Sequence, residues 1–533
     1  MVEYRAISGI ALLSAAALAV SGLISLSRTT GQRHTTARAP RAAISRSRTV
    51  SLTRPVLAPP VRPPAWKRCT GLPSPPPGAG PAPAGLRCAT LRVPLDYAAP
   101  SGAKIGLALV KVPATDRRHR IGSLLFNFGG PGGAGVDTLA QVAGRYGDLR
   151  TRYDLIGFDP RGVGRSTHVR CVSDRSLDKL AAIDDSPDTT AEETAYINAR
   201  AGYVRQCEAR SGDLLPHVGT VNAARDMEMI RIALGDGKLR YFGISYGTWL
   251  GGVYAHQFPG SVGRAVLDGA VDTGIGSVDL ALQQAAAFQR ALGGFAAACA
   301  RLGRKACPLG ADGPSVAAST GRILAGLDRR PLPTSSGREL TQSLGTTGVA
   351  AALYSRNAWP YLAQGLVDAL KRRDGSLLLM LADARNGRGQ DGTYGSLSAA
   401  NTAITCADTP DRPIPADVRR LLPKFRDASP VFGTSMAWGL LQCTGWPVPG
   451  DAAAREVSAP SAAPILVVGT TGDPATPYAW APALTRELGG RATLLTLRGQ
   501  GHGAYDTGDP CVREAVNAYL LRGALPAAGA VCG

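Results

Sequence analysis

Short apolar runs alternate with helical patterns over the first half of the chain. Between the runs, residues 222–234 carry apolar side chains at helical spacing, and a further helix is expected from about Tyr246. Strands that alternate with helices predict a mostly parallel sheet with helices on both faces. The runs that predict strands are 90–97, 105–112, 123–128, 153–158, 239–243 and 264–267.

The pattern changes near Gly274. Residues 278–300 are rich in Ala, Leu and Gln, and further helical segments are predicted at 316–327, 348–353, 362–371 and 377–382. No strand signal occurs before Pro464; strands then return at 465–468 and 493–497, and a closing helix is expected over about 511–521. We therefore predict one α/β domain, formed by residues 69–274 and 446–533, that is interrupted by a helical lid over residues 275–445.

The first 68 residues have a different composition. Residues 6–26 are uncharged and apolar, with Arg5 before them and Arg28 after them, so residues 1–27 are predicted to form a signal peptide or a membrane anchor. Residues 28–68 contain ten Lys or Arg, no acidic residue and several Pro, which is typical of an extended linker. The alternative is a basic arm that binds polyanions of the cell envelope or associates with the membrane.

The net charge of +19 is concentrated in this linker. Its ten positive charges, together with the cancelling pair Glu3 and Arg5, leave +9 for residues 69–533. That excess is modest, so a nucleic-acid partner is not expected. The 44% hydrophobic and 19% charged residues exclude a polytopic membrane protein and a wholly disordered chain.

The ten cysteines indicate export. All of them follow the linker, and none forms a C-x-x-C pair, which removes the commonest zinc-binding and thioredoxin-like spacings. Loop closure favours nearby partners, so sequential pairing is the simplest hypothesis. With the apolar leader, the cysteines predict a protein that is secreted or anchored on the outer side of the cytoplasmic membrane; free thiols in a cytosolic enzyme are the alternative. The expected pairs are Cys69–Cys88, Cys171–Cys207, Cys299–Cys307, Cys406–Cys443 and Cys511–Cys532.

A G-x-S-x-G motif follows the predicted strand 239–243 and precedes a predicted helix. It reads Gly243-Ile244-Ser245-Tyr246-Gly247. On such a tight turn a serine stands at the edge of the sheet, and the helix directs its amide N–H groups toward developing negative charge. Ser245 is therefore the candidate nucleophile.

A histidine and a carboxylate at late strand ends complete a candidate triad. His502 lies in a glycine-flanked loop after the predicted strand 493–497, whereas His256 follows the helix after Ser245 and is better explained by packing. Asp473 follows the strand 465–468 and gives the chain order Ser, Asp, His. Asp268, which ends the strand 264–267, is the competing acid.

A glycine-rich loop, residues 128–135, follows the strand 123–128. It lacks G-K-[ST] and a ribose-binding acid, so a nucleotide site is not expected. Its better use is to supply a backbone N–H to an oxyanion, paired with the N–H of Tyr246. Gly130 is the preferred donor and Gly129 the second choice. No metal or cofactor is expected.

Together these motifs resemble the exported tripeptidyl aminopeptidases of high-GC bacteria, which have the α/β-hydrolase fold and are related to proline iminopeptidases. The resembling sequences are VPLDY, GGPGGAG, YDLIGFDPRGVGRS, GISYGTWLGGVYAHQFP, AITCAD and GDPATP. The resemblance implies an α/β-hydrolase fold with a helical lid, a triad of Ser245, Asp473 and His502, and oxyanion donors at Gly130 and Tyr246. Proline iminopeptidases have His where this chain has Phe128, which favours the tripeptidyl branch.

Substrate-binding residues are less evident from the motifs. An aminopeptidase must bind an ammonium group, for which a buried carboxylate is well suited, and Asp408 beside Cys406 is a candidate. Thr476 is a candidate for the pocket wall. For Asp408 the stronger alternative is a capping or surface aspartate, and for Thr476 a role in the turn is an equal alternative. Arg161 and Arg165 are expected to hold loops together.

We therefore predict an exported serine aminopeptidase that releases tripeptides or other short peptides from substrates with free N-termini through an acyl-enzyme. Two alternatives use the same observations differently. One is an esterase or amidase that acts on small-molecule or envelope esters and amides with the same triad. The other is a non-catalytic wall-associated protein that binds through the basic linker.

Overall fold

The computed structural model describes residues 62–75 and 83–533. The predicted leader, residues 1–27, and most of the predicted linker lie outside the described residues. Within the described part, no helix is both long enough and apolar enough to cross a membrane.

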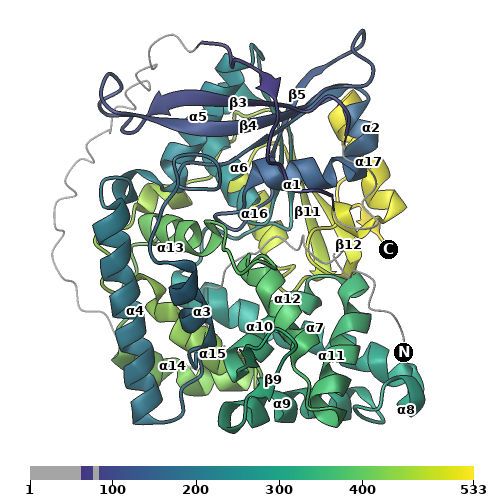
Figure 1. Cartoon of the computed structure of the whole chain (residues 1–533). Coiled ribbons are helices and arrows are strands. Elements are labelled where there is room, and N and C mark those ends of the chain that lie inside the picture. The colour runs from purple at the N-terminus through teal and green to yellow at the C-terminus, as the bar shows by residue number, and fades with distance from the viewer. Residues whose placement is uncertain (1–61, 76–82) are drawn as a thin grey trace, which may run out of the picture.

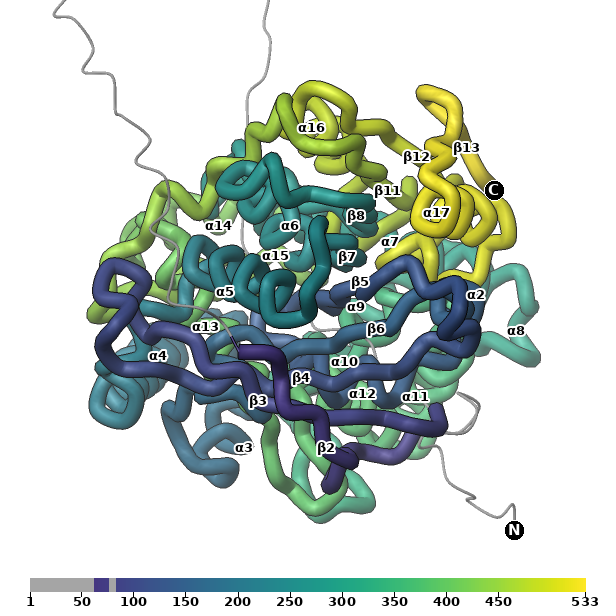
Figure 2. The backbone as a smooth tube through the Cα atoms, turned by 90° about the horizontal axis from the view of Figure 1, so that it is seen from above, coloured from purple at the N-terminus to yellow at the C-terminus, as the bar shows by residue number. Residues whose placement is uncertain are grey.

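A ten-stranded sheet runs through the upper half of the molecule (Figure 1). Its order is β13-β12-β11-β8-β7-β5-β6-β4-β3-β2, as seen across Figure 2. Strand β4 pairs antiparallel with β3 and with β6, whereas the strands from β6 to β13 pair in parallel, which confirms the predicted mostly parallel sheet. The strands are β2 (Lys67–Arg68), β3 (Arg87–Pro94), β4 (Lys104–Val112), β5 (Gly122–Asn127), β6 (Tyr153–Phe158), β7 (Leu239–Ile244), β8 (Val262–Asp268), β11 (Ile465–Gly472), β12 (Ala492–Gln500) and β13 (Val531–Cys532).

Both faces of the sheet are buried. Because successive side chains of a strand point to opposite faces, Leu125 and Leu267 belong to one apolar cluster and Leu124 and Val266 to another. Helices α5 (Thr220–Ala233), α6 (Tyr246–Gln257) and α16 (Trp480–Leu488) cover the first face, and α1 (Gly135–Val142) and α17 (Pro510–Arg522) cover the second. Burial on both faces explains why the central strands are continuous apolar runs in the sequence.

Most of the remaining helices form a region below the sheet in Figure 1, which we call the helical region. Its own apolar core includes Phe288, Phe295, Leu362 and Trp438. A short antiparallel hairpin of two-residue strands, β9 (Leu332–Pro333) and β10 (Glu339–Leu340), also lies in this stretch, so the prediction that no strand occurs between Gly274 and Pro464 is wrong. The helices of this stretch are α7 (Ser277–Arg301), α8 (Gly303–Ala306), α9 (Gly313–Arg329), α10 (Gln342–Leu353), α11 (Trp359–Lys371), α12 (Ser376–Asn386), α13 (Leu397–Asp408), α14 (Pro415–Ala428) and α15 (Gly433–Trp438).

Two helices from the first half of the chain also pack against the helical region. They are α3 (Asp174–Ala182) and α4 (Thr190–Ser211), and the apolar pattern of the sequence predicts neither of them. The Tyr196 hydroxyl donates to the Trp438 carbonyl at 3.2 Å, and α3 contacts α10. The predicted division at 274/275 and 445/446 places α3 and α4 in the α/β part. Helix α4 packs on both sides: Tyr203 and Cys207 belong to the apolar cluster on the first face of the sheet, and Tyr196 belongs to the core of the helical region.

Five disulfides join the ten cysteines in the predicted sequential pairs. They are Cys69–Cys88, Cys171–Cys207, Cys299–Cys307, Cys406–Cys443 and Cys511–Cys532. Such a set is typical of proteins that fold in an oxidising compartment outside the cytoplasm.

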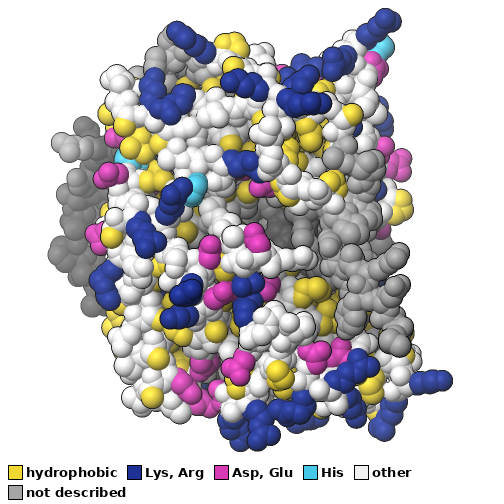
Figure 3. Space-filling view, in the orientation of Figure 1, with side chains coloured by type: hydrophobic (Ala, Val, Ile, Leu, Met, Phe, Trp, Pro, Cys, Tyr) yellow, Lys and Arg dark blue, Asp and Glu magenta, His cyan; other side chains and the backbone are white. Residues whose placement is uncertain are grey.

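Charged side chains of both signs are interspersed over the face of the molecule in Figure 3, and Lys and Arg gather along its lower edge, over the helical region. This face therefore presents a mixed surface of the kind common among globular proteins.

Candidate active site

Ser245 lies on the sharp turn between β7 and α6. Its φ of 58° and ψ of −124° are unusual for a residue with a side chain, as expected for a strained turn that exposes a nucleophile. The neighbouring glycines are required by close packing: a Cβ on Gly243 would lie 2.3 Å from the Gly247 carbonyl oxygen, and one on Gly247 would lie 2.6 Å from the Asn127 carbonyl oxygen. The sequence motif thus has the backbone geometry that it predicts.

Asp473 and His502 meet at the ends of β11 and β12. The imidazole Nδ1 of His502 lies 2.9 Å and 3.0 Å from the two Asp473 carboxylate oxygens. Asp473 also accepts the N–H groups of Ala475 and Thr476, each at 2.8 Å, and the Thr476 hydroxyl at 3.0 Å. The carboxylate is therefore held in one orientation by its own loop and can orient the imidazole.

Thr476, predicted to line the pocket, does so and also contacts the acid and the base. Its hydroxyl oxygen lies 3.2 Å from His502 Nδ1 in addition to its bond to Asp473. A Cβ on Gly269, at the end of β8, would lie 3.2 Å from both Thr476 Oγ1 and His502 Cε1. The structure thus places Thr476 against the Asp–His pair as well as along the pocket.

Asp268, the competing acid, has a different set of partners. Its carboxylate accepts the N–H groups of Ala504 and Tyr505 at 2.8 Å each, and its backbone carbonyl accepts the N–H of Ser245 at 2.9 Å. Burial raises the pKa of Asp268 to about 6, against the effect of these N–H donors. Asp268 therefore connects the Ser245 turn to the His502 loop, while Asp473 contacts the imidazole.

Two buried atoms at this edge have no hydrogen-bond partner among the described residues. They are Ser245 Oγ and His502 Nε2, the pair between which a serine hydrolase must transfer a proton. Catalytic hydrogen bonds are often long before substrate binds. Both atoms are thus available, one to attack and one to accept.

The glycine loop after β5 passes directly over the Ser245 turn. Gly129 has a φ of +90°, and a Cβ there would lie 2.7 Å from the Ile244 carbonyl oxygen and 2.9 Å from Ser245 Cβ, so only glycine fits. The Gly129 N–H donates to the Asn127 side chain at 3.0 Å. This favours Gly130, which lines the same pocket as Ser245 and Tyr246, as the loop donor to an oxyanion.

The helical region reaches the histidine through Tyr354, directly after α10. The Tyr354 carbonyl accepts the His502 N–H at 2.9 Å, and its ring packs nearly perpendicular to the imidazole, with centroids 5.3 Å apart. No sequence signal pointed to this residue. The contact makes the helical region part of the wall around the candidate base.

A pocket opens between the sheet edge and the helical region. Gly130, Ser245, Tyr246 and Thr476 line it from the sheet side. Trp249, Val271, Leu280 and Trp480 add apolar surface, and Asp408 and Arg455 add charge. A mostly apolar wall with a few polar groups is the usual form of a small-ligand site.

Asp408, the candidate ammonium-binding residue, lies at the end of α13 and is 2% exposed. Its carboxylate accepts the N–H and the hydroxyl of Thr220, at 2.7 Å and 2.6 Å, and it forms no ion pair with any described residue. Burial raises its pKa to about 7. A buried carboxylate without a cationic partner, facing a pocket, is well placed to bind a cation brought by a ligand.

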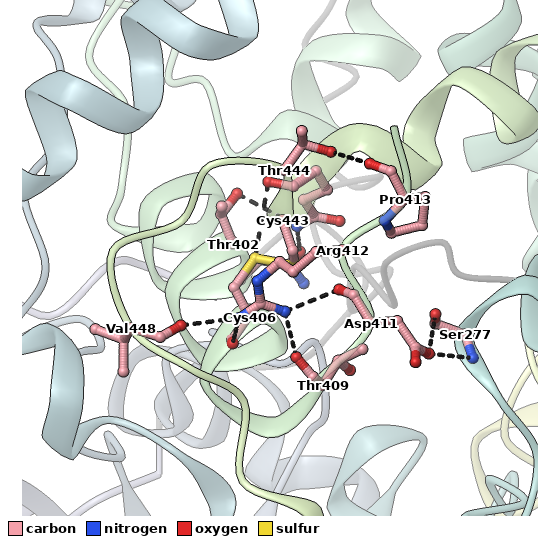
Figure 4. The surroundings of a disulfide bond; sticks show 12 residues. Ser277, Thr402, Cys406, Thr409, Asp411, Arg412, Pro413, Cys443, Thr444 and Val448 are labelled. Carbon is pink, nitrogen blue, oxygen red and sulfur yellow. Dashed lines mark hydrogen bonds between the residues drawn. A yellow bond between two sulfur atoms is a disulfide. The ribbon is translucent and has the colours of Figure 1, made fainter. Parts of the chain in front are cut away.

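The segments on either side of Asp408 are firmly held, as Figure 4 shows for Cys406, Asp411 and Arg412. The disulfide Cys406–Cys443 ties α13 to the end of the helical region. The Arg412 guanidinium donates to the Cys406 carbonyl at 2.9 Å and to three further carbonyls, which places a cation at the negative end of α13. The Asp411 carboxylate accepts the N–H of Ser277 at 3.1 Å and also its hydroxyl, so the segment is anchored to the start of α7.

Arg161 and Arg165 hold loops together, as predicted. The fully buried Arg161 guanidinium forms a two-point ion pair with Asp226 at 2.6 and 2.7 Å. Arg165 pairs with Asp137 at 2.8 Å. Neither arginine lines the pocket.

A strained serine turn, an Asp–His pair and a glycine loop at one edge of a mostly parallel sheet define a serine hydrolase of the α/β-hydrolase fold. The sequence model of a family described as TAP-like protein matches residues 429–532. Serine protease Hip1 of Mycobacterium tuberculosis (strain ATCC 25618 / H37Rv) is 40% identical over 442 residues, which cover 79% of this chain and 82% of that protein. Carboxylesterase B of the same strain is 37% identical over 428 residues, with coverage of 79% and 81%. Tripeptidyl aminopeptidase of Streptomyces lividans is 33% identical over 436 residues and covers 78% of each chain.

The chain therefore belongs to the α/β-hydrolase family that includes Hip1 and the tripeptidyl aminopeptidases. The resemblance inferred from the motifs is confirmed.

Proposed function

We propose that the chain is an exported serine aminopeptidase that releases tripeptides or other short peptides from free N-termini. One observation carries the proposal: a buried carboxylate without a cationic partner, Asp408, lines the same pocket as the candidate nucleophile Ser245. The names of relatives, a serine protease and tripeptidyl aminopeptidases, support peptide substrates.

In the proposed mechanism, His502 removes the proton of Ser245 as its hydroxyl oxygen attacks the substrate carbonyl. The N–H groups of Gly130 and Tyr246 bind the oxyanion, and Asp473 stabilises the imidazolium that forms. His502 then gives the proton to the leaving amine, and the N-terminal fragment remains as an ester on Ser245. Water, deprotonated by His502, hydrolyses the ester and frees the short peptide.

The proposed role of Asp408 explains why a free N-terminus would be required. An α-ammonium group in the pocket would give the buried carboxylate the counter-ion that it lacks in the free protein. An acetylated N-terminus is neutral and would leave that carboxylate unpaired, which costs binding free energy.

The test compares kcat/KM for a tripeptide p-nitroanilide with a free N-terminus and for its N-acetylated counterpart. The wild-type chain should prefer the free substrate by on the order of a hundredfold, because a buried charge pair is at stake. Asp408→Asn should lose most of that preference. Equal turnover of both substrates by the wild-type chain would refute the aminopeptidase assignment.

A second candidate function is hydrolysis of small-molecule or envelope esters and amides with the same triad. It is favoured by the 37% identity to a protein named carboxylesterase B. An esterase should process acyl esters well and should be indifferent to acetylation of a peptide N-terminus, so the same substrate pair separates the two functions.

The proposed location is outside the cytoplasmic membrane, either secreted or anchored through residues 1–27, with cell-wall association through residues 28–68. The five disulfides support an oxidising compartment. Fractionation of cells that express the full chain, with N-terminal sequencing of the exported protein, tests this location. A membrane fraction that retains residues 1–27 supports the anchor, and a released protein that lacks them supports a cleaved signal peptide.

A further inference from the structure

We propose that Thr220 is a positioning residue for substrate recognition: its hydroxyl and its N–H hold the Asp408 carboxylate in place for the α-ammonium group of a peptide. The inference rests on the proposed function and extends it to a residue that no sequence motif indicated.

Thr220 provides both hydrogen bonds that the Asp408 carboxylate receives from described residues. Its N–H lies 2.7 Å from Asp408 Oδ1 and its hydroxyl lies 2.6 Å from Oδ2, so each carboxylate oxygen has one donor. Thr220 is the first residue of α5, where a backbone N–H has no partner within the helix. Each carboxylate oxygen keeps a further lone pair, and that capacity suits an ammonium group with its three N–H donors.

The Thr220 hydroxyl also has a second neighbour. It lies 2.5 Å from the Tyr246 hydroxyl. Because its one proton goes to Asp408, the Thr220 oxygen accepts from Tyr246, and the three groups form a chain that ends on the carboxylate. The residue that would recognise the N-terminus is thus joined, through Thr220, to the residue after the nucleophile.

The backbone at Gly219, just before Thr220, lies very close to the Asp408 carboxylate. A Cβ on Gly219 would lie 3.0 Å from Asp408 Oδ1, closer than a neighbouring side chain normally comes to an oxygen that must stay in place. Glycine therefore lets the start of α5 come close to the end of α13, although the two segments are 188 residues apart in the chain.

The charges near Asp408 do not replace an ammonium group. Asp451 adds negative charge and raises the pKa of Asp408 beyond the effect of burial. Arg455 lines the same pocket, but its nearest carboxylate is Asp411, at 3.5 Å. His217 lies in a turn that packs against α13, and burial lowers the pKa of its imidazole. The hydrogen bonds from Thr220 are the contacts that favour the ionised form of Asp408.

The test uses Thr220→Val, which keeps the shape of the side chain and removes the hydroxyl, with Thr220→Ser as the matched control that keeps it. Two substrates are compared from pH 5.5 to 7.5: a tripeptide p-nitroanilide with a free N-terminus, and p-nitrophenyl acetate, which has no ammonium group. For Thr220→Val we expect KM for the peptide to rise about tenfold or more at pH 7, because a hydrogen bond to a charged group is lost. Turnover of the acetate ester should fall by a clearly smaller factor, because the ester has no ammonium group for Asp408 to bind.

The pH profile of peptide KM distinguishes a loss of support for the Asp408 carboxylate from a general loss of folded structure. Without the hydroxyl, the Asp408 carboxylate should ionise at higher pH, so the pH at which peptide binding weakens should move upward in Thr220→Val and return in Thr220→Ser. Should Thr220→Val not fold, Thr220→Ala removes the same hydroxyl and is read in the same way.

Two results would overturn the inference. An unchanged peptide KM in Thr220→Val would show that the hydroxyl is dispensable for recognition. Equal losses with the peptide and with the ester would show that Thr220 serves the fold or Tyr246 instead. Asp408→Asn distinguishes these failures from failure of the function itself: if that variant binds the free peptide as the wild type does, the ammonium site is wrong, whatever Thr220 does.

Discussion

Two regions border the pocket: the sheet edge, with Ser245, Asp473 and His502, and the pocket wall, with Asp408 and its partner Thr220. They differ in how far apart in the chain the residues lie that hold each carboxylate. At the sheet edge, Ser245, Asp473 and His502 each follow directly from a strand of the same sheet, and Asp473 is held by donors within three residues of it. At the pocket wall, Asp408 is held by Thr220 from a different helix, 188 residues away.

We assign the two regions different tasks: the sheet edge carries out the chemical steps, and the pocket wall recognises the N-terminus of the substrate. A triad on strand ends inherits its geometry from the sheet, so many sequences can retain it while the helices change. A carboxylate fixed between two distant helices depends on how the helical region packs. We therefore expect variants at the sheet edge to affect all substrates, and variants at the pocket wall to affect only substrates with a free N-terminus.

The largest effect is expected for Ser245→Ala, which removes the nucleophile. Turnover of any substrate should fall by on the order of 10⁶-fold, with an unchanged unfolding transition. Ser277→Ala is the matched control, because Ser277 also lines the pocket but bonds to Asp411, and it should cost less than about tenfold. Hydrolysis of a tripeptide p-nitroanilide measures both; comparable losses would remove Ser245 from the chemistry.

The next largest effect compares the two acids at the sheet edge. Asp473→Asn should lower kcat by about 10⁴-fold, because the amide no longer fixes the imidazole tautomer. Asp268→Asn should cost about a hundredfold or less, and should lower the free energy of unfolding by about 1–3 kcal/mol, because a buried N–H of the His502 loop loses its acceptor. A larger kinetic loss in Asp268→Asn than in Asp473→Asn would reverse their assignment.

A smaller effect is a pH dependence at the pocket wall. The pKa of Asp408 is raised to about 7, so its carboxyl becomes protonated as the pH falls through 7. KM for a peptide with a free N-terminus should then rise, by up to about tenfold per pH unit below 7. Asp408→Asn should give a KM that changes little between pH 5.5 and 7.5. The same pH-dependent KM in that variant would assign the titration to another group.

The smallest effect is on stability. A carboxyl with a raised pKa binds its proton more tightly in the folded protein than in the unfolded chain, so its contribution to stability falls as the pH rises from about 4 to about 7. Asp408→Asn should therefore unfold at higher denaturant concentration than the wild type at pH 8, and the gap should narrow toward pH 5.

Asp411→Asn is the matched control for that measurement. Burial alone would raise the pKa of Asp411, but hydrogen bonds from Ser277 hold that pKa below its usual range. The ionised carboxylate therefore stabilises the folded protein at pH 8, and Asp411→Asn should destabilise it. Lower stability of both variants at pH 8 would indicate that Asp408 has a structural role only.

The sequence predicted the sheet edge well because its signals are local. The Gly243–Gly247 motif lies between a strand and a helix, and a Cβ added to Gly129, Gly243 or Gly247 would lie only 2.3–2.7 Å from a carbonyl oxygen. The same holds for the disulfides, which close loops between residues 8 to 37 apart. In each case the signal lies within a short stretch of sequence, although the contact that requires glycine at Gly247 is with Asn127, from a distant segment.

The sequence could not predict the pocket wall because its contacts join distant segments. Thr220 is an ordinary residue for the start of a helix, and nothing near it in the chain indicates Asp408. Helix α4 was missed for a related reason: it buries only four side chains over 22 residues, among them Tyr196 and Cys207, so its apolar pattern is weak. Asp408 is predicted from the chemistry that an ammonium site requires, and the structure identifies Thr220 as the hydrogen-bond partner of its carboxylate.

The central claim is that Ser245 attacks a peptide carbonyl and retains the N-terminal fragment while Asp408 holds the free N-terminus. Mass spectrometry of the chain, quenched in acid during turnover of a peptide with a free N-terminus, tests this claim directly. We predict an adduct on Ser245 with the mass of the N-terminal tripeptide less water, strongly reduced in Asp408→Asn and absent in Ser245→Ala. An adduct on another residue, or an adduct of equal amount with the N-acetylated peptide, would contradict the account.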